Sequence, residues 1–205
     1  MLCPGWNGRP GQYYRLIKAL TERGYSVIGV DPPGHGQSNG NHTSILEIAS
    51  LIEMLSTQYD FVGFVGHSAG AMAGFSAIAN GSAFNRAVFV AMPNNSKSLL
   101  LHYCQSMQLS GKTCRALMQH FLNIHGEHAF TRTSPEFLCE HIKIPALLIH
   151  DEGDTVVPVI HSQMIADKIA DSNLFLTRRY GHFRILNAAS VTDEICAFFH
   201  EEIIK

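Results

Sequence analysis

The sequence has little charge, few cysteines and no long apolar run. Charged residues make up 16% of the 205 residues and leave a formal net charge of −2. This balance provides no electrostatic attraction for a nucleic acid or an anionic membrane surface. No apolar run is long enough for a membrane span, and the first residues lack the regions of a signal peptide. We therefore expect a single cytoplasmic domain over residues 1–205.

The cysteines are odd in number, scattered, and form no C-x-x-C pair; they are Cys3, Cys104, Cys114, Cys139 and Cys196. This pattern favours reduced thiols over a disulfide framework.

Signals for a cofactor or a metal are also missing. The complete phosphate-loop pattern Gly-x-x-x-x-Gly-Lys-Ser/Thr does not occur, since the Gly-Lys-Thr at residues 111–113 has a serine at position 106. Neither Gly63-x-x-Gly66 nor the loop 34–36 has the glycine spacing of a nucleotide-binding fingerprint. His120, His125 and His128 lie near Glu127 but span a helix end without a familiar ligand interval, which favours a solvated helix terminus. We expect neither a cofactor nor a metal.

What the chain does contain is a regular alternation of apolar strands and amphipathic helices. Strands are predicted at residues 25–30, 61–66, 86–92, 146–150 and 174–177, with an apolar stub at residues 1–3. Helices are predicted at residues 12–23, 44–55, 69–80, 160–170 and 190–203, the second opened by the capping box Ser44-x-x-Glu47. The alternation predicts an α/β fold with a mostly parallel sheet and helices on both faces.

Residues 94–143 interrupt this alternation. They contain no credible strand, and helices are predicted at residues 96–109 and 113–125. A third helix is predicted to begin at Ser134-Pro135, with Ser134 as its cap. We expect this helical insertion to form a lid over the carboxyl edge of the sheet. Most of its apolar residues should close the lid onto the core, and a minority should line an acyl pocket.

The stretch from Phe61 to Gly70 holds one serine between two glycines, directly after a strand and before a helix. In such a turn, side chains two positions before and after Ser68 would collide with the neighbouring strand and helix, so Gly66 and Gly70 fit there. His67 is expected to orient the turn or to pack. A helix cap is the ordinary alternative for Ser68.

A serine nucleophile needs a base and an orienting carboxylate. Two later loops can supply them, because each follows a parallel strand and so lies at the same edge as Ser68. The first loop contains Asp151, Glu152 and Asp154, and the second contains His182. The order serine, acid, histidine is the one expected for this architecture. Spacing alone leaves the choice of acid open.

Four ordered motifs carry a family resemblance. They are Gly-His-Ser-Ala-Gly at 66–70, Asp-Pro-Pro-Gly-His-Gly-Gln-Ser at 31–38, Asp-Thr-Val-Val-Pro at 154–158 and Gly-His at 181–182. With these motifs the chain resembles the α/β-hydrolase-fold serine hydrolases over nearly its whole length, especially small bacterial members of the esterase and lipase type.

The resemblance implies that Ser68 is the nucleophile, His182 the base and then the acid, and Asp154 the orienting carboxylate, with Asp151 and Glu152 as solvated charges. It also implies an oxyanion hole formed by the backbone N–H groups of Trp6 and Ala69. His35, in a turn, is expected to be structural.

The chain departs from the family pattern at its start. Pro4 occupies the place of the usual first-loop histidine, and two earlier edge strands have no counterpart. The fold is therefore expected to be N-terminally abbreviated, either as a short version or because the true start lies upstream of Met1.

The function expected is hydrolysis of a small carboxylic ester with an apolar acyl or alcohol part. A thioesterase or acyltransferase with the same residues is an alternative, whereas a dehalogenase would need a carboxylate at position 68. A catalytically silent binding protein is an alternative of another class. No feature of the sequence indicates an oligomeric state.

Overall fold

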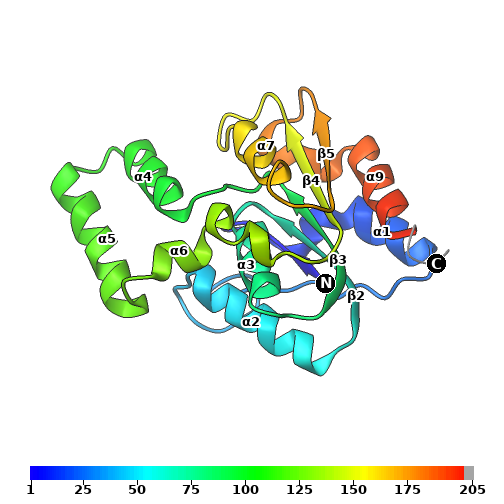
Figure 1. Ribbon diagram of the computed structural model, residues 1–205, viewed down its shortest axis with the longest axis horizontal. Helices are drawn as coiled ribbons and strands as arrows, with labels where there is room; N and C mark the ends of the chain where they lie inside the picture. Colours follow the sequence, from blue (N-terminus) through cyan, green and yellow to red (C-terminus); the bar gives the residue numbers. More distant parts are fainter. Residues whose placement is uncertain (201–205) are drawn as a thin grey trace.

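The computed structural model describes residues 1–200 and has a parallel sheet of five strands in the order β1-β2-β3-β4-β5 (Figure 1). The strands are β1 (Leu2–Cys3), β2 (Phe61–His67), β3 (Phe84–Val90), β4 (Ala146–Asp151) and β5 (Ser172–Thr177). The α-helices are α1 (Tyr14–Glu22), α2 (Ile45–Gln58), α3 (Ser68–Ala79), α4 (Ser96–Ser106), α5 (Gly111–His125), α6 (Ala129–Thr133), α7 (Ile160–Ala166), α8 (Gly181–Arg184) and α9 (Ala189–His200). Short 3-10 helices lie at Pro10–Tyr13, Pro135–Phe137, Cys139–His141 and Ile185–Asn187.

Helices cover both faces of the sheet, as the alternation predicted. Alternate strand side chains enter different clusters: Phe64 and Leu148 pack with α2, α3 and α7, whereas Val65 and Ile149 pack with α1 and α9. This period of two is the property of a strand that is buried on both faces. Because all five strands are parallel, they end at the same carboxyl edge of the sheet, and the loops with polar residues leave from this edge.

The expected strand at residues 25–30 is not formed, which corrects the prediction. Gly29 makes only an isolated parallel bridge to Leu2, although Leu2 donates to the Ile28 carbonyl and accepts from the Val30 N–H. Only Val30 in this stretch is buried. The physical reason is its neighbour: β1 has two residues, so it offers too few backbone groups for a regular ladder.

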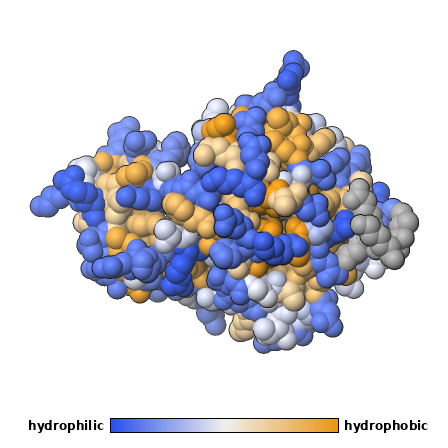
Figure 2. All heavy atoms as spheres, viewed as in Figure 1, coloured by the Kyte–Doolittle hydropathy of each residue, from blue (hydrophilic) through white to orange (hydrophobic). Residues whose placement is uncertain are grey.

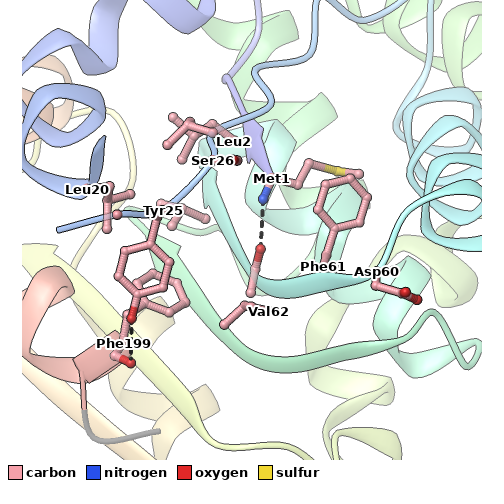
Figure 3. A pocket seen from close by; sticks show the side chains of 13 residues that line it. Met1, Leu2, Leu20, Tyr25, Ser26, Asp60, Phe61, Val62 and Phe199 are labelled. Carbon is pink, nitrogen blue, oxygen red and sulfur yellow. Dashed lines mark hydrogen bonds between the residues drawn. The ribbon is translucent and has the colours of Figure 1, made fainter. Parts of the chain in front are cut away.

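A cavity of about 250 Å³ lies beside this irregular edge (Figure 3). Tyr25 donates from its hydroxyl to the Phe199 carbonyl at 3.1 Å on one side of the cavity, and Phe61 stands on the other. The Met1 amino group donates to the Gly63 carbonyl at 2.8 Å. The cavity lies at the amino end of β2, far along the strand from Ser68.

Helix boundaries differ from the predictions in small ways. The helix expected at residues 160–170 ends at Ala166, and the last helix is described to His200, so residues 201–203 of that prediction lie outside the described part. Ser44 caps α2 by accepting from the Glu47 N–H at 3.2 Å. No helix within residues 1–200 is long and apolar enough to cross a bilayer.

The segment of residues 94–143 is helical without strands, as expected, but Ser134 does not cap a helix with its side chain. Its hydroxyl oxygen instead accepts from the Ser96 N–H at 2.9 Å and lies 3.0 Å from the Ser96 hydroxyl oxygen. Thr133 donates to the same Ser96 hydroxyl at 2.7 Å. These three side chains form a buried hydroxyl cluster that joins the start of α4 to the end of α6.

We predict that Gly74→Ala destabilises the protein by about 1–3 kcal/mol, because overpacking a filled core forces neighbours to move. A Cβ at this position would lie 2.1 Å from two ring atoms of Phe64, which is fully buried. Urea unfolding measures the change.

Gly111→Ala is the matched control for this prediction. A Cβ at this first residue of α5 would have no neighbouring atom closer than 3.5 Å, so the change should be neutral or slightly stabilising. Equal effects of the two substitutions would contradict the packing argument.

Candidate active site

Ser68 lies at the sharp turn between β2 and α3, with a positive φ of 51°. Such a conformation is costly for a residue with a side chain and persists only where packing enforces it. A Cβ at Gly66 would lie 2.7 Å from the Ala71 Cα, and one at Gly70 would lie 2.2 Å from the Pro4 carbonyl oxygen. The predicted need for glycine at both positions is confirmed.

Asp154 and His182 are in direct contact. The Asp154 loop follows β4, and His182 lies in α8 after β5. The His182 Nδ1 lies 2.7 Å from the Asp154 Oδ2, and both side chains are almost completely buried. The other carboxylate oxygen accepts from the N–H groups of Val156 and Val157, each at 2.8 Å. The carboxylate is thus fixed from two sides.

The environment of Asp154 keeps its carboxyl ionised. Burial alone would raise its pKa, but hydrogen bonds from His150, His182 and the Val157 N–H outweigh this effect and hold the pKa well below its usual range.

His150 is a second histidine beside Asp154 that the sequence reasoning missed. Its Nε2 lies 2.8 Å from the Val157 carbonyl and 3.4 Å from the Asp154 Oδ2. Its Nδ1 lies 2.7 Å from the Ser162 hydroxyl. Since a carbonyl only accepts, Nε2 carries a proton and donates to the Val157 carbonyl. His150 therefore links α7 to the Asp154 loop.

His67 packs and positions, as expected. Its Nε2 donates to the His182 carbonyl at 2.8 Å, and the two rings are 4.7 Å apart. Burial, followed by the nearby His182, lowers the pKa of His67 to about 3. The ring is therefore neutral at physiological pH and works as a hydrogen-bond donor.

Of the three residues that the resemblance assigns, Asp154 and His182 are joined directly, and Ser68 shares a cavity with His182. Within residues 1–200, the Ser68 hydroxyl makes no hydrogen bond to His182. Both residues line one cavity of about 670 Å³ at the carboxyl edge of the sheet. Hydrogen bonds of catalytic groups are often long in a free enzyme and tighten with substrate.

The loop at residues 4–11 lies against Ser68 and is tied down by other parts of the chain. A Cβ at Gly5 would lie 3.1 Å from the Ser68 Cβ, and Gly5, Trp6 and Ala69 all border the cavity. The Asn7 N–H donates to the His35 Nε2 at 3.0 Å, and the Trp6 and His35 rings meet edge to face. His35 therefore holds the loop, in line with its predicted structural role.

The outer wall of the cavity is apolar and comes from α4, α5 and α6. The wall residues are Leu99, Leu100, Tyr103, Leu117, Phe121 and Phe130. Leu101 and Met107, two other apolar residues of the helical segment, are exposed and do not border the cavity. Apolar surface appears among polar side chains on this side of the molecule in Figure 2, where α4 and α5 lie in Figure 1.

Asp151 is not a solvated charge, which corrects the prediction. Its exposed fraction is 0%, and its carboxylate accepts three hydrogen bonds. Glu152 does lie in solvent, where it pairs with Arg178 at 2.5 Å. Asp154 is the acid that contacts His182.

Within the described residues, no group of three or more His, Cys, Asp or Glu side chains is placed to hold a metal ion. His125 instead lies against the Phe121 ring, with the ring centroids 4.8 Å apart. All five cysteines are free and buried. Burial raises the pKa of the Cys3 thiol to about 12, so this thiol beside the site is unreactive at neutral pH.

Comparison with known proteins agrees with this fold. The sequence profile of the alpha/beta hydrolase fold family matches residues 1–123. The chain belongs to this family. A search of curated proteins found no significant match.

Solved structures of this fold superpose on nearly the whole chain. An esterase from Exiguobacterium antarcticum aligns with a TM-score of 0.76 and 18% identity, covering 97% of this chain and 91% of its own. The esterase Pf2001 from Pyrococcus furiosus aligns with a TM-score of 0.72 and 20% identity, covering 98% of this chain and 82% of its own. A monoacylglycerol lipase from Paleococcus ferrophilus aligns with a TM-score of 0.72 and 20% identity, covering 97% of this chain and 91% of its own. At these identities the likeness establishes the fold.

We predict that His67 makes the free energy of unfolding depend on pH. Its pKa is about 3 when folded, against an ordinary value of 6.5, so the unfolded chain binds a proton that the folded one does not. Stability should fall as the pH drops from 6.5 towards 3, by up to about 1.4 kcal/mol per pH unit from this residue.

Urea unfolding of wild type and His67→Gln between about pH 7.5 and 4.5 measures this effect. The glutamine amide can still donate to the His182 carbonyl but does not titrate. The two stability curves should converge towards low pH by the amount that His67 contributes; parallel curves would contradict the assignment.

Proposed function

We propose that the protein is a serine hydrolase that cleaves small carboxylic esters, with Ser68 as nucleophile, His182 as general base and acid, and Asp154 as the orienting carboxylate. The observation that carries this proposal is the 2.7 Å contact between His182 Nδ1 and Asp154 Oδ2 beside the cavity that contains Ser68. A carboxylate that accepts from Nδ1–H leaves Nε2 free to accept a proton.

The reaction would proceed in two halves. Ser68 Oγ attacks the ester carbonyl carbon while its proton passes to His182 Nε2. The tetrahedral intermediate collapses, the bond to the alcohol oxygen breaks, and His182 returns the proton to that oxygen. Water then attacks the acyl-enzyme, gives a proton to the same nitrogen and releases the acid, and Ser68 recovers its proton.

The N–H groups of Trp6 and Ala69 would stabilise the oxyanion. Ala69 lies in the first turn of α3, where N–H groups have no partner within the helix and the helix dipole favours negative charge. Trp6 lies in the loop that His35 holds. Pro4 lacks an N–H, but neither proposed donor depends on it.

The substrate would place an apolar group against the wall from α4, α5 and α6. A cavity of about 670 Å³ falls within the usual range for small ligands, roughly 300–1,000 Å³. We propose residues 94–143 as a lid, because three of its helices border the cavity at the strand ends. The names of the similar structures, two esterases and a monoacylglycerol lipase, support an ester substrate.

Thioester hydrolysis and acyl transfer would use the same residues. The pocket, and whether water or another acceptor enters it, would separate these reactions from ester hydrolysis. A silent binding protein is disfavoured, since Ser68, Asp154 and His182 are all present. We propose a cytoplasmic location, which the five free thiols favour.

We predict that a fluorophosphonate labels the wild type and fails to label Ser68→Ala. For p-nitrophenyl butyrate, Ser68→Ala and His182→Ala should each lower kcat/KM by a factor of about 10⁴ or more. Mass spectrometry and turnover assays measure the two effects.

Ser190→Ala and His102→Ala are matched controls, since both residues are exposed and neither borders the cavity. Labelling of Ser68→Ala at the wild-type rate would refute the nucleophile. Esterase activity that survives in His182→Ala would refute the base.

We further predict that Leu117→Trp shortens the preferred acyl chain. Each methylene buried in the apolar wall should raise kcat/KM about fourfold until the wall is reached, from roughly 0.8 kcal/mol per methylene. The larger side chain should reduce octanoate hydrolysis and spare acetate hydrolysis in a p-nitrophenyl ester series. Ile124→Trp, on the same helix but 60% exposed and outside the cavity, should keep the wild-type profile.

A further inference from the structure

Asp151 is a fully buried carboxylate for which the proposed mechanism has no use. One oxygen, Oδ1, accepts from the Gly153 N–H at 3.0 Å. The other, Oδ2, accepts from the Thr177 hydroxyl at 2.8 Å and from the Tyr180 N–H at 3.0 Å. The two oxygens therefore bind different segments: one binds the loop after β4, and the other binds the end of β5 and the loop after it.

These partners lie close to the two residues of the 2.7 Å contact. Gly153 directly precedes Asp154, and Tyr180 lies two residues before His182. The main chain of Asp151 adds a further tie, because its carbonyl accepts from the Asp154 N–H at 3.0 Å. We propose that Asp151 is a positioning residue that fixes the Asp154 loop against the His182 loop; this inference rests on the proposed function.

The loop after β5 needs such a tie, because its backbone is unusual. Arg179 and Gly181 have φ values of 74° and 64°, so left-handed residues flank Tyr180 on both sides. A non-glycine residue in that region costs free energy and persists only where the surroundings hold it. The Tyr180 N–H in the middle of this turn is held by Asp151 Oδ2.

The carboxylate is ionised in this position. Burial would raise the pKa of Asp151, but the N–H groups of Tyr180 and Gly181, the Thr177 hydroxyl and the Gly153 N–H together lower it below its ordinary value. Both oxygens can therefore accept at once.

Asparagine cannot replace this carboxylate without conflict. In one orientation its NH₂ group faces the Tyr180 N–H, and in the flipped orientation it faces the Gly153 N–H. Either way one backbone donor loses its acceptor and meets another donor. Asp151→Asn thus tests the tie with almost no change in side-chain volume.

The test compares Asp151→Asn with Thr177→Val, their double variant and the control Glu152→Gln, using turnover of p-nitrophenyl butyrate. We expect Asp151→Asn to lower kcat about 10- to 100-fold with KM changed less than about threefold, because a misplaced catalytic group loses rate before it loses binding. Thr177→Val should lower kcat only a few-fold, and the double variant should resemble Asp151→Asn. Glu152→Gln, the same chemical change at the exposed neighbour, should keep the wild-type kcat.

A proton NMR signal separates positioning from general stability. The His182 Nδ1–H, held against a carboxylate, should give a downfield resonance in the wild type and in Glu152→Gln. It should weaken or shift upfield in Asp151→Asn and less so in Thr177→Val, while thermal unfolding shows that the variants are folded at the assay temperature.

An unchanged kcat and an unchanged resonance in folded Asp151→Asn would overturn the inference. If that variant does not fold, the same two results in Thr177→Val would overturn it. The NMR measurement does not depend on ester turnover: an inactive, unlabelled wild type would refute the proposed hydrolase, while loss of the resonance in Asp151→Asn would still support the positioning role.

Discussion

The close approach of α3 to β2 and to the first loop is the constraint on which the site depends. Gly66, Gly70 and Gly74 mark successive points of this contact, facing Ala71, the Pro4 carbonyl and the Phe64 ring. None of these places has room for a Cβ. Because the helix is pressed so tightly onto the sheet, its first residue is forced into the left-handed conformation that carries Ser68 to the carboxyl edge.

Both carboxylate oxygens of Asp154 have hydrogen-bond partners. One oxygen takes two backbone donors, and the other takes His182 with His150 slightly farther away. Two of the three histidines near this centre, His67 and His150, have a backbone carbonyl within 2.8 Å of Nε2. They fix the orientation of the loops, so that only His182 combines contact with the carboxylate and access to the cavity. The three imidazole rings thus differ in their hydrogen-bond partners, although they are chemically identical.

The sequence was sufficient for the fold class, the turn at Ser68 and the pairing of Asp154 with His182, because each depends on short motifs in a fixed order. It was insufficient where a residue's surroundings come from distant segments. Asp151 looks like a loop charge until Thr177 and Tyr180 are brought to it. Residues 25–30 have strand-forming side chains, but the ladder depends on the length of β1. Ser134 fits a helix cap locally, yet its hydroxyl binds Ser96, which is 38 residues away.

The buried hydroxyl cluster of Ser96, Thr133 and Ser134 gives the helical segment a closed base. The cluster joins the start of α4 to the end of α6, so the chain between residues 96 and 134 is a loop whose ends are already fixed to each other. Doubling the length of such a loop costs only about 0.6 kcal/mol in closure entropy. Insertions and exchanges in α4 and α5 are therefore tolerable without disturbing the strand ends. In this architecture the shape of the cavity wall can evolve independently of the residues at the sheet edge.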